Sequence, residues 1–197
     1  MKLSLFSLAA VVLLGSPGPA IAALIAVGKE RGFLQGLRFY AGLQMGLAVA
    51  AGVSAAGLFS AFAAIPGAMK TMMFIATAYL LYLSYKIAFT PVGPAETETR
   101  SGFASTVAGG MLLGVTNPKA YIAFASLMAS YTIVRLDTVA DMSIKWMVCV
   151  VVMIVVDLAW LWAGVVLGRV NLRPTTESVI NVVMGGTILT TALMAFL

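Results

Sequence analysis

The sequence predicts an all-α integral membrane protein in which six transmembrane helices form two inverted three-helix repeats, with helices one and four broken at proline motifs. Of the 197 residues, 61% are hydrophobic and only 10% are charged, with a mean hydropathy of +1.04. A soluble domain carries roughly 25% charged residues. The charged residues gather in short clusters between apolar stretches, each close to the ~20 residues that a bilayer requires. Two of these stretches contain corresponding proline motifs.

Charged and Pro/Gly-bearing segments separate the predicted spans. The clearest linker is the polar segment 91–101, which divides a first repeat at 1–90 from a second, inverted repeat at 102–197. We expect one loop over residues 29–38 and another over residues 135–145. The predicted spans cover residues 3–28, 39–64, 70–86, 102–132, 146–168 and 178–197.

The basic residues predict the orientation. Seven Lys and Arg residues lie in the connections after spans one, three and five, and four lie on the opposite side. The positive-inside rule therefore places both termini outside and segment 91–101 in the cytoplasm, in the cell inner (plasma) membrane. The net charge of +5 then belongs to loops that face anionic lipid and not to a nucleic-acid surface. The seven residues are Lys29, Arg31, Arg38, Lys86, Arg100, Arg169 and Arg173; the four are Lys2, Lys70, Arg135 and Lys145.

A secretory signal peptide would also explain the start of the chain. Lys2, an apolar core and the Ala20-Ile21-Ala22 triplet resemble such a segment and its cleavage site. The apolar run, however, continues to Gly28 and is long enough to span a bilayer. We therefore expect a transmembrane span here.

Two similar breaks interrupt spans one and four. Ser16-Pro17-Gly18-Pro19 lies in span one, and Thr116-Asn117-Pro118-Lys119 lies in span four. Each offers a hydroxyl or amide N-cap followed by proline, a start signal for a new half-helix. Paired breaks at corresponding positions of two repeats indicate the binding site of a secondary transporter. The alternative is a pair of proline kinks without a ligand.

The breaks predict a carboxylate site. Unpaired backbone groups at membrane depth are tolerated only where protein or a water-filled cavity satisfies them. The start of each second half-helix carries a partial positive charge, and two such ends can hold one carboxylate. We expect the substrate site to include Ser16, Pro17, Gly18, Pro19, Thr116, Asn117, Pro118 and Lys119.

Asp157 is the predicted proton carrier. It is the only acid inside a predicted span and lies twelve residues from both Lys145 and Arg169. An acid near the bilayer midplane is a functional candidate by default. The alternative is a structural ion pair with Lys119. That lysine is expected to add positive charge to the carboxylate site, to cap nearby carbonyls or to pair with Asp157.

Three further polar residues are cavity candidates. Gln44 in span two and Asn181 in span six either line the cavity or join helices by hydrogen bonds, and Tyr79 lies deep in span three. The chain has no histidine and a single cysteine, Cys149. Nothing in the sequence predicts a metal site, a cofactor or a nucleotide-binding motif.

Glycines at four-residue spacing occur in three spans. In lipid, small residues let helices approach closely. These pairs are either plain packing contacts within the chain or, where a face is left over, compatible with a homodimer. They are Gly42/Gly46, Gly110/Gly114 and Gly164/Gly168.

The broken segments also carry a family resemblance. The chain resembles the LysE/RhtB family of amino-acid exporters in GSPGPA (15–20) and GVTNPKAY (114–121), with support from AYLLYLSYK (78–86), VDLAWLWAG (156–164) and INVVMGG (180–186). The resemblance covers almost the whole chain. It implies six helices, two inverted repeats, export of amino acids or related solutes, and proton antiport, but it does not fix the substrate. This chain has SPGP where members often have TPGP.

The leading hypothesis is therefore a secondary exporter whose partners are an amino acid or similar solute, protons and membrane lipid. A channel or a scaffold-type membrane protein is the alternative. An intramembrane enzyme is disfavoured because the sequence has no histidine, no cluster of metal ligands and no second acid inside a predicted span.

Overall fold

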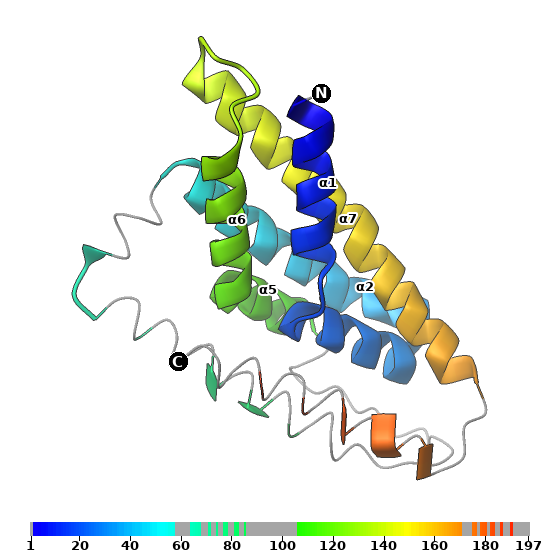
Figure 1. Ribbon diagram of the computed structural model, residues 1–197. Helices are drawn as coiled ribbons and strands as arrows, with labels where there is room; N and C mark the ends of the chain where they lie inside the picture. The colour runs from blue at the N-terminus through cyan, green and yellow to red at the C-terminus, as the bar shows by residue number, and fades with distance from the viewer. Residues whose placement is uncertain are drawn as a thin grey trace.

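The computed structural model describes residues 2–57, 64–67 and 106–170, with isolated positions and short stretches between 71 and 85 and between 175 and 190. All regular structure in this part is helical. Most of predicted spans three and six and the linker at 91–101 lie outside the described residues. The number of spans and the symmetry of the repeats therefore stay predictions. The helices, drawn in Figure 1, are α1 (Lys2–Gly15), α2 (Pro19–Ala55), α5 (Val107–Thr116), α6 (Pro118–Ser130) and α7 (Thr138–Arg169).

Both predicted helix breaks are present. α1 and α2 are separated by three residues and bent by 64°. α5 and α6 are separated by Asn117, whose backbone is extended (φ −72°, ψ 102°). Pro19 and Pro118 each stand at the start of the following helix, where proline has the right φ and its missing N–H would have had no partner.

The predicted loop over residues 29–38 is wrong, because α2 runs through it with a single interruption at Gly32. Gly32 has φ 71° and ψ −177°, a combination available essentially only to glycine. No atom lies within 4 Å of the position that a Cβ would occupy there, so backbone conformation and not crowding requires the glycine. The two parts of α2 on either side of Gly32 lie at an angle to each other (Figure 1).

The predicted loop over residues 135–145 is also wrong at its C-terminal end. α7 begins at Thr138, and the Asp137 carboxylate caps it by accepting a 2.9 Å hydrogen bond from the Ala140 N–H. Asp141 and Lys145 therefore lie inside α7, and both are buried. Charge does not mark a loop here because the two side chains form a 2.7 Å ion pair.

This ion pair fixes the connection between α6 and α7. Asp141 Oδ1 accepts hydrogen bonds from the N–H groups of Ile133 at 2.5 Å and Val134 at 2.8 Å. Lys145 Nζ donates to the carbonyl oxygen of Met128, near the end of α6, at 2.9 Å. Each charge is thus satisfied on more than one side, as a buried ion pair requires.

The glycine pairs lie at helix–helix contacts within the chain. A Cβ added to Gly42 would lie 1.9 Å from the Val107 carbonyl oxygen, and one added to Gly110 would lie 2.1 Å from the Phe39 carbonyl oxygen. α5 therefore packs backbone to backbone against α2. A Cβ on Gly164 would lie 2.3 Å from a carbonyl oxygen in the first part of α2. Contacts of the same kind are made by Gly46, Gly114 and Gly168.

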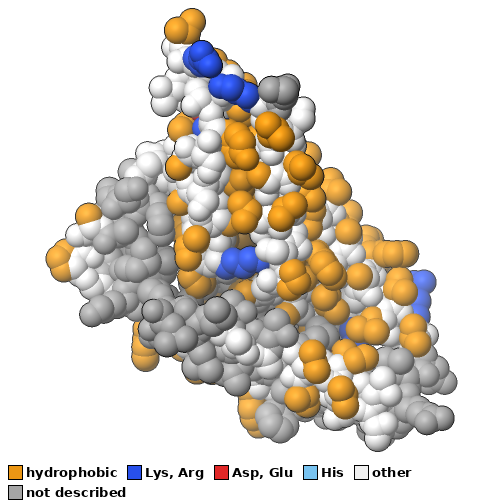
Figure 2. Space-filling model, in the orientation of Figure 1, with side chains coloured by type: hydrophobic (Ala, Val, Ile, Leu, Met, Phe, Trp, Pro, Cys, Tyr) orange, Lys and Arg blue, Asp and Glu red, His pale blue; other side chains and the backbone are white. Residues whose placement is uncertain are grey.

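The outer surface suits an apolar environment. Among the described helices, α7 is long and apolar enough to cross a bilayer, and α1 with α2 passes the same test as one bent pair. Leu8 and Val12 of α1 and Val155 and Trp162 of α7 are each about 60% exposed. Figure 2 shows an extended apolar face over these helices, with basic side chains toward its ends and near its middle. A patch of this size on a soluble monomer would be unusual.

Candidate functional site

At the first break, the side chain of Ser16 gives a hydrogen-bond donor to one carbonyl group at the end of α1. Ser16 Oγ donates a 2.8 Å hydrogen bond to the Leu13 carbonyl oxygen in the last turn of α1. The N-cap of α2 is Gly18, which has an extended backbone and no side chain that could cap. The prediction that Ser16 caps the second half-helix is therefore wrong: the serine lies two residues too early, and its hydroxyl bonds back to α1.

The second break repeats this arrangement. Thr116 Oγ1 donates a 2.7 Å hydrogen bond to the Leu112 carbonyl oxygen in the last turn of α5. Asn117 is the N-cap of α6, but its side chain makes no capping bond. The Ala120 N–H donates instead to the Asn117 backbone carbonyl at 3.0 Å. Asn117 Oδ1 is buried and has no hydrogen-bond partner.

Lys119 connects the two breaks. From the first turn of α6 its ammonium group donates to the carbonyl oxygen of Ser16, and to that of Pro17 at 3.0 Å. These carbonyls follow the end of α1. Of the three roles expected for Lys119, the one seen in the structure is therefore the capping of nearby carbonyl groups. No salt bridge joins Lys119 to Asp157, although both are described and line one cavity.

Asp157 approaches the breaks from α7. It is 4% exposed, and its Oδ2 accepts a 2.8 Å hydrogen bond from Gln44 Nε2 of α2. Gln44 Nε2 also lies 3.4 Å from the Met153 carbonyl oxygen, while Gln44 Oε1 is buried and has no partner. Gln44 therefore joins two helices and orients the carboxylate. It does not line the cavity, so of the two roles expected for it the structure has the joining of helices.

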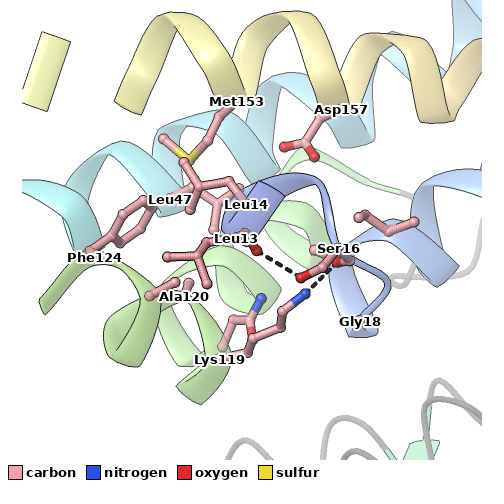
Figure 3. A pocket seen from close by; sticks show the side chains of 14 residues that line it. Leu13, Leu14, Ser16, Gly18, Leu47, Lys119, Ala120, Phe124, Met153 and Asp157 are labelled. Atoms are coloured by element: carbon pink, nitrogen blue, oxygen red, sulfur yellow. Dashed lines mark hydrogen bonds between the residues drawn. The ribbon is translucent and has the colours of Figure 1, made fainter. Parts of the chain in front are cut away.

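A small cavity lies where these elements meet. Its volume is about 40 Å³, enough for ordered water but below the 300–1,000 Å³ typical of small-molecule sites. Asp157 points into it from α7 and Lys119 from α6, between the Ser16 break and apolar side chains (Figure 3). Its lining residues are Leu13, Leu14, Ser16, Gly18, Ala20, Ile21, Leu47, Asn117, Lys119, Ala120, Ala123, Phe124, Met153 and Asp157.

The cavity contains the parts that a zwitterion needs. The starts of α2 and α6 border it and carry partial positive charge, and Lys119 adds a full one. Asp157 and the free Asn117 Oδ1 supply hydrogen-bond acceptors. A buried carboxyl group beside an ammonium group can also take up and release a proton, because its two states are stabilised by different neighbours.

The described site residues that the sequence predicts differ in position. The residues that line the cavity are Ser16, Gly18, Asn117, Lys119 and Asp157. The residues that shape the two breaks are Pro17, Pro19, Thr116 and Pro118, and Gln44 donates a hydrogen bond to Asp157 from outside the cavity lining. Tyr79 and Asn181 lie outside the described residues.

Sequence reasoning missed Tyr40. Its hydroxyl donates a 2.9 Å hydrogen bond to the Ile154 carbonyl oxygen, one turn before Asp157 in α7. The available signal was spacing: Tyr40 and Gln44 are four residues apart and share one face of α2. Sequence reasoning also missed Asp141, which is a second acid inside an apolar helix. Within the described part of the chain, no group of three or more His, Cys, Asp or Glu side chains could hold a metal ion.

Comparison with known proteins gives one match. A family model described as LysE type translocator matches residues 11–197. The searches of curated proteins and of solved structures gave no match. The family match covers both breaks, Gln44 and Asp157, and so includes every residue that builds the cavity.

Proposed function

Because the chain belongs to the LysE type translocator family, a family of membrane transporters, we propose that it is a secondary exporter of amino acids or related small solutes. It exchanges the solute for protons by alternating access in the inner (plasma) membrane. The solute carries a carboxylate and an ammonium group. Both termini lie outside the cell.

The observation that carries this proposal is the meeting of two helix breaks, one acid and one base at a single cavity. The helix starts and Lys119 favour a carboxylate, and Asp157 with Asn117 favours an ammonium group. Lys119 caps two carbonyls and Asp157 accepts one bond from Gln44, but an apolar helix junction needs neither charge for its packing, and burying charge is costly. The cavity also has to enlarge before an amino acid can enter, which fits a carrier that moves between states.

Asp157 is the group that we assign to proton coupling. Export against a gradient requires an energy source, and the chain has no nucleotide-binding motif. Asp157 is buried, has one side-chain hydrogen-bond donor and faces the cavity. Protonation removes the charge of Asp157. The free-energy difference between the outward-open and inward-open states would then depend on whether Asp157 carries a proton.

The test uses proteoliposomes that contain labelled amino acid and receive an imposed pH step. We expect the step to drive labelled efflux by the wild type, and Asp157→Asn to lower that pH-driven efflux by at least about tenfold, since asparagine cannot titrate. Exchange of labelled for unlabelled amino acid should continue in Asp157→Asn, because it needs no net proton movement.

Asp137→Asn is the matched control. It removes an acid from the start of the same helix, outside the cavity, and asparagine caps helices as well as aspartate does. It should behave as the wild type. A response of Asp157→Asn equal to that of the wild type would contradict coupling through this residue, and efflux that does not saturate would indicate a channel.

A further inference from the structure

The Lys119 ammonium group occupies a site made by another part of the chain. It donates to two successive carbonyl groups, those of Ser16 and Pro17, directly after α1. Carbonyls at the C-terminal end of a helix lack intrahelical partners and carry partial negative charge. An ammonium group has three donors in a compact head, so it suits this pair of oxygens.

The surroundings of this ammonium group are rich in acceptors. Asn117 lines the cavity and is only 5% exposed, and its Oδ1 is buried without a partner. The Asp157 carboxylate lines the same cavity and has Gln44 as its side-chain donor. Since a buried acceptor without a donor is unfavourable, the cavity has spare acceptor capacity. The ammonium group of a ligand would supply N–H donors.

Gly18 provides the space that Lys119 occupies. A Cβ at position 18 would lie 2.9 Å from Lys119 Cδ and 3.0 Å from Nζ. The glycine has an extended backbone (φ −175°), which any residue can adopt. Conformation therefore does not require a glycine here, but a Cβ would displace the Lys119 ammonium group from its present position.

We propose that the carbonyl oxygens of Ser16 and Pro17 form a binding site for a primary ammonium group. In the empty protein Lys119 fills this site. In the loaded protein the ammonium group of the substrate replaces it, and Lys119 turns to the substrate carboxylate. The replacement of Lys119 by the substrate rests on the proposed function, whereas the ammonium site itself does not. The exchange conserves charge, because a zwitterion brings one group of each sign.

The test is chemical rescue followed by thermal unfolding of the purified protein in detergent. Lys119→Ala leaves both carbonyls without a donor and vacates the space of three carbons and the ammonium nitrogen, because alanine keeps Cβ. We expect a lower Tm for this variant, and ethylammonium chloride, which fits this space without overlapping Cβ, should raise that Tm by about 2–4 °C or more, because a ligand that binds only the folded state stabilises it. The wild type should not respond, since its site is filled.

Four controls make the result specific. Ethanol and tetramethylammonium chloride, which lack an ammonium N–H, should not stabilise Lys119→Ala. Lys2→Ala removes an exposed lysine from the start of α1 and should not respond to the amine. Gly18→Ala combined with Lys119→Ala should weaken the rescue, because the added Cβ lies only 3.0 Å from the position of the ammonium nitrogen and narrows the site.

The outcomes separate this site from the transport proposal. Equal shifts in all variants, or no shift in Lys119→Ala, overturn the ammonium site. A Lys119→Ala protein that does not fold even when ethylammonium is present also overturns it. For the loaded state, amino acids should stabilise the wild type and their N-acetyl derivatives should not. Rescue by ethylammonium without any effect of amino acids would keep the ammonium site and contradict the amino-acid substrate.

Discussion

Two buried acids of α7 differ in how well they are satisfied. Asp141 has an ion pair with Lys145 and accepts two backbone hydrogen bonds. Asp157 has one side-chain donor, Gln44, and a cavity beside it. A carboxylate with full partners holds structure, whereas one with spare acceptor capacity can bind a ligand or a proton. The two acids both lie inside the apolar helix, but they differ in the number of their hydrogen-bonding partners.

Replacing one member of the Asp141–Lys145 pair should destabilise the protein strongly. Asp141→Asn leaves the Lys145 ammonium group buried without an opposite charge, and breaking such a pair costs about 3–5 kcal/mol. We expect the Tm in detergent to fall by at least about 6 °C. Asp141→Asn combined with Lys145→Met should recover much of the loss, because no unpaired charge remains.

An equal loss in the single and double variants would contradict a charge-pair origin. In that case the acceptor bonds to Ile133 and Val134 would be the main contribution of Asp141.

Several residues that line the cavity could be predicted from the sequence alone. Asp157, Asn117 and Lys119 stand out because polar groups in apolar stretches are rare and costly, and all three line the cavity. The partner of each group could not be found in this way. Lys119 bonds to residues more than 100 positions earlier, and only the folded chain brings them together. Ser16 was given the wrong role because its hydroxyl can bond to the helix before it or to the helix after it.

At the scale of helices, proline was a better guide than charge. Both breaks occur as predicted because proline cannot continue a helix and is well placed at the start of one. Charge was misleading at residues 29–38, where one glycine makes the turn, and at Lys145, where an ion pair neutralises the charge. A cluster of charges shows where polar groups lie along the chain but not whether the backbone leaves the helix.

The contact between α5 and α2 should not tolerate a methyl group at Gly110. A Cβ there would lie 2.1 Å from the Phe39 carbonyl oxygen, so the helices have to separate. Overpacking of this kind costs about 1–3 kcal/mol, and we expect Gly110→Ala to lower the Tm in detergent by several degrees.

Gly52→Ala is the matched control in α2. The nearest atom to a Cβ at that position is Trp146 Nε1, at 3.6 Å, which is an ordinary contact. Alanine is favoured over glycine inside a helix, so the Tm should stay the same or rise slightly. If Gly110→Ala and Gly52→Ala behave alike, close backbone packing of α5 on α2 does not contribute to stability.

Across the whole described part of the molecule, the helices pack unevenly from one end to the other. The backbone contacts of Gly28 and Gly164 lie toward the end where α7 finishes. Toward the start of α7, a groove of about 540 Å³ lies between it and the end of α2; Gly52, Ala55, Thr138, Met142 and Trp146 are among its lining residues. The cavity at the breaks lies between these two regions, which is where the proposed alternating access would need its binding site.

Two exposed leucines at opposite ends of the described helices test the orientation. Leu34 is 81% exposed beside the turn at Gly32, and Leu136 is 100% exposed just before α7. A helix of 32 residues is about 48 Å long, so we expect these positions to flank a bilayer. The positive-inside rule assigns the Leu34 end to the cytoplasm.

A membrane-impermeant maleimide on intact cells should therefore label Leu136→Cys and should label Leu34→Cys only after permeabilisation. The native Cys149 is buried, so the unmodified protein should give little background. The opposite pattern would place both termini inside. Labelling of both variants from outside would mean that the two ends of α7 do not lie on opposite sides of the membrane, and the spanning arrangement of this helix would then be wrong.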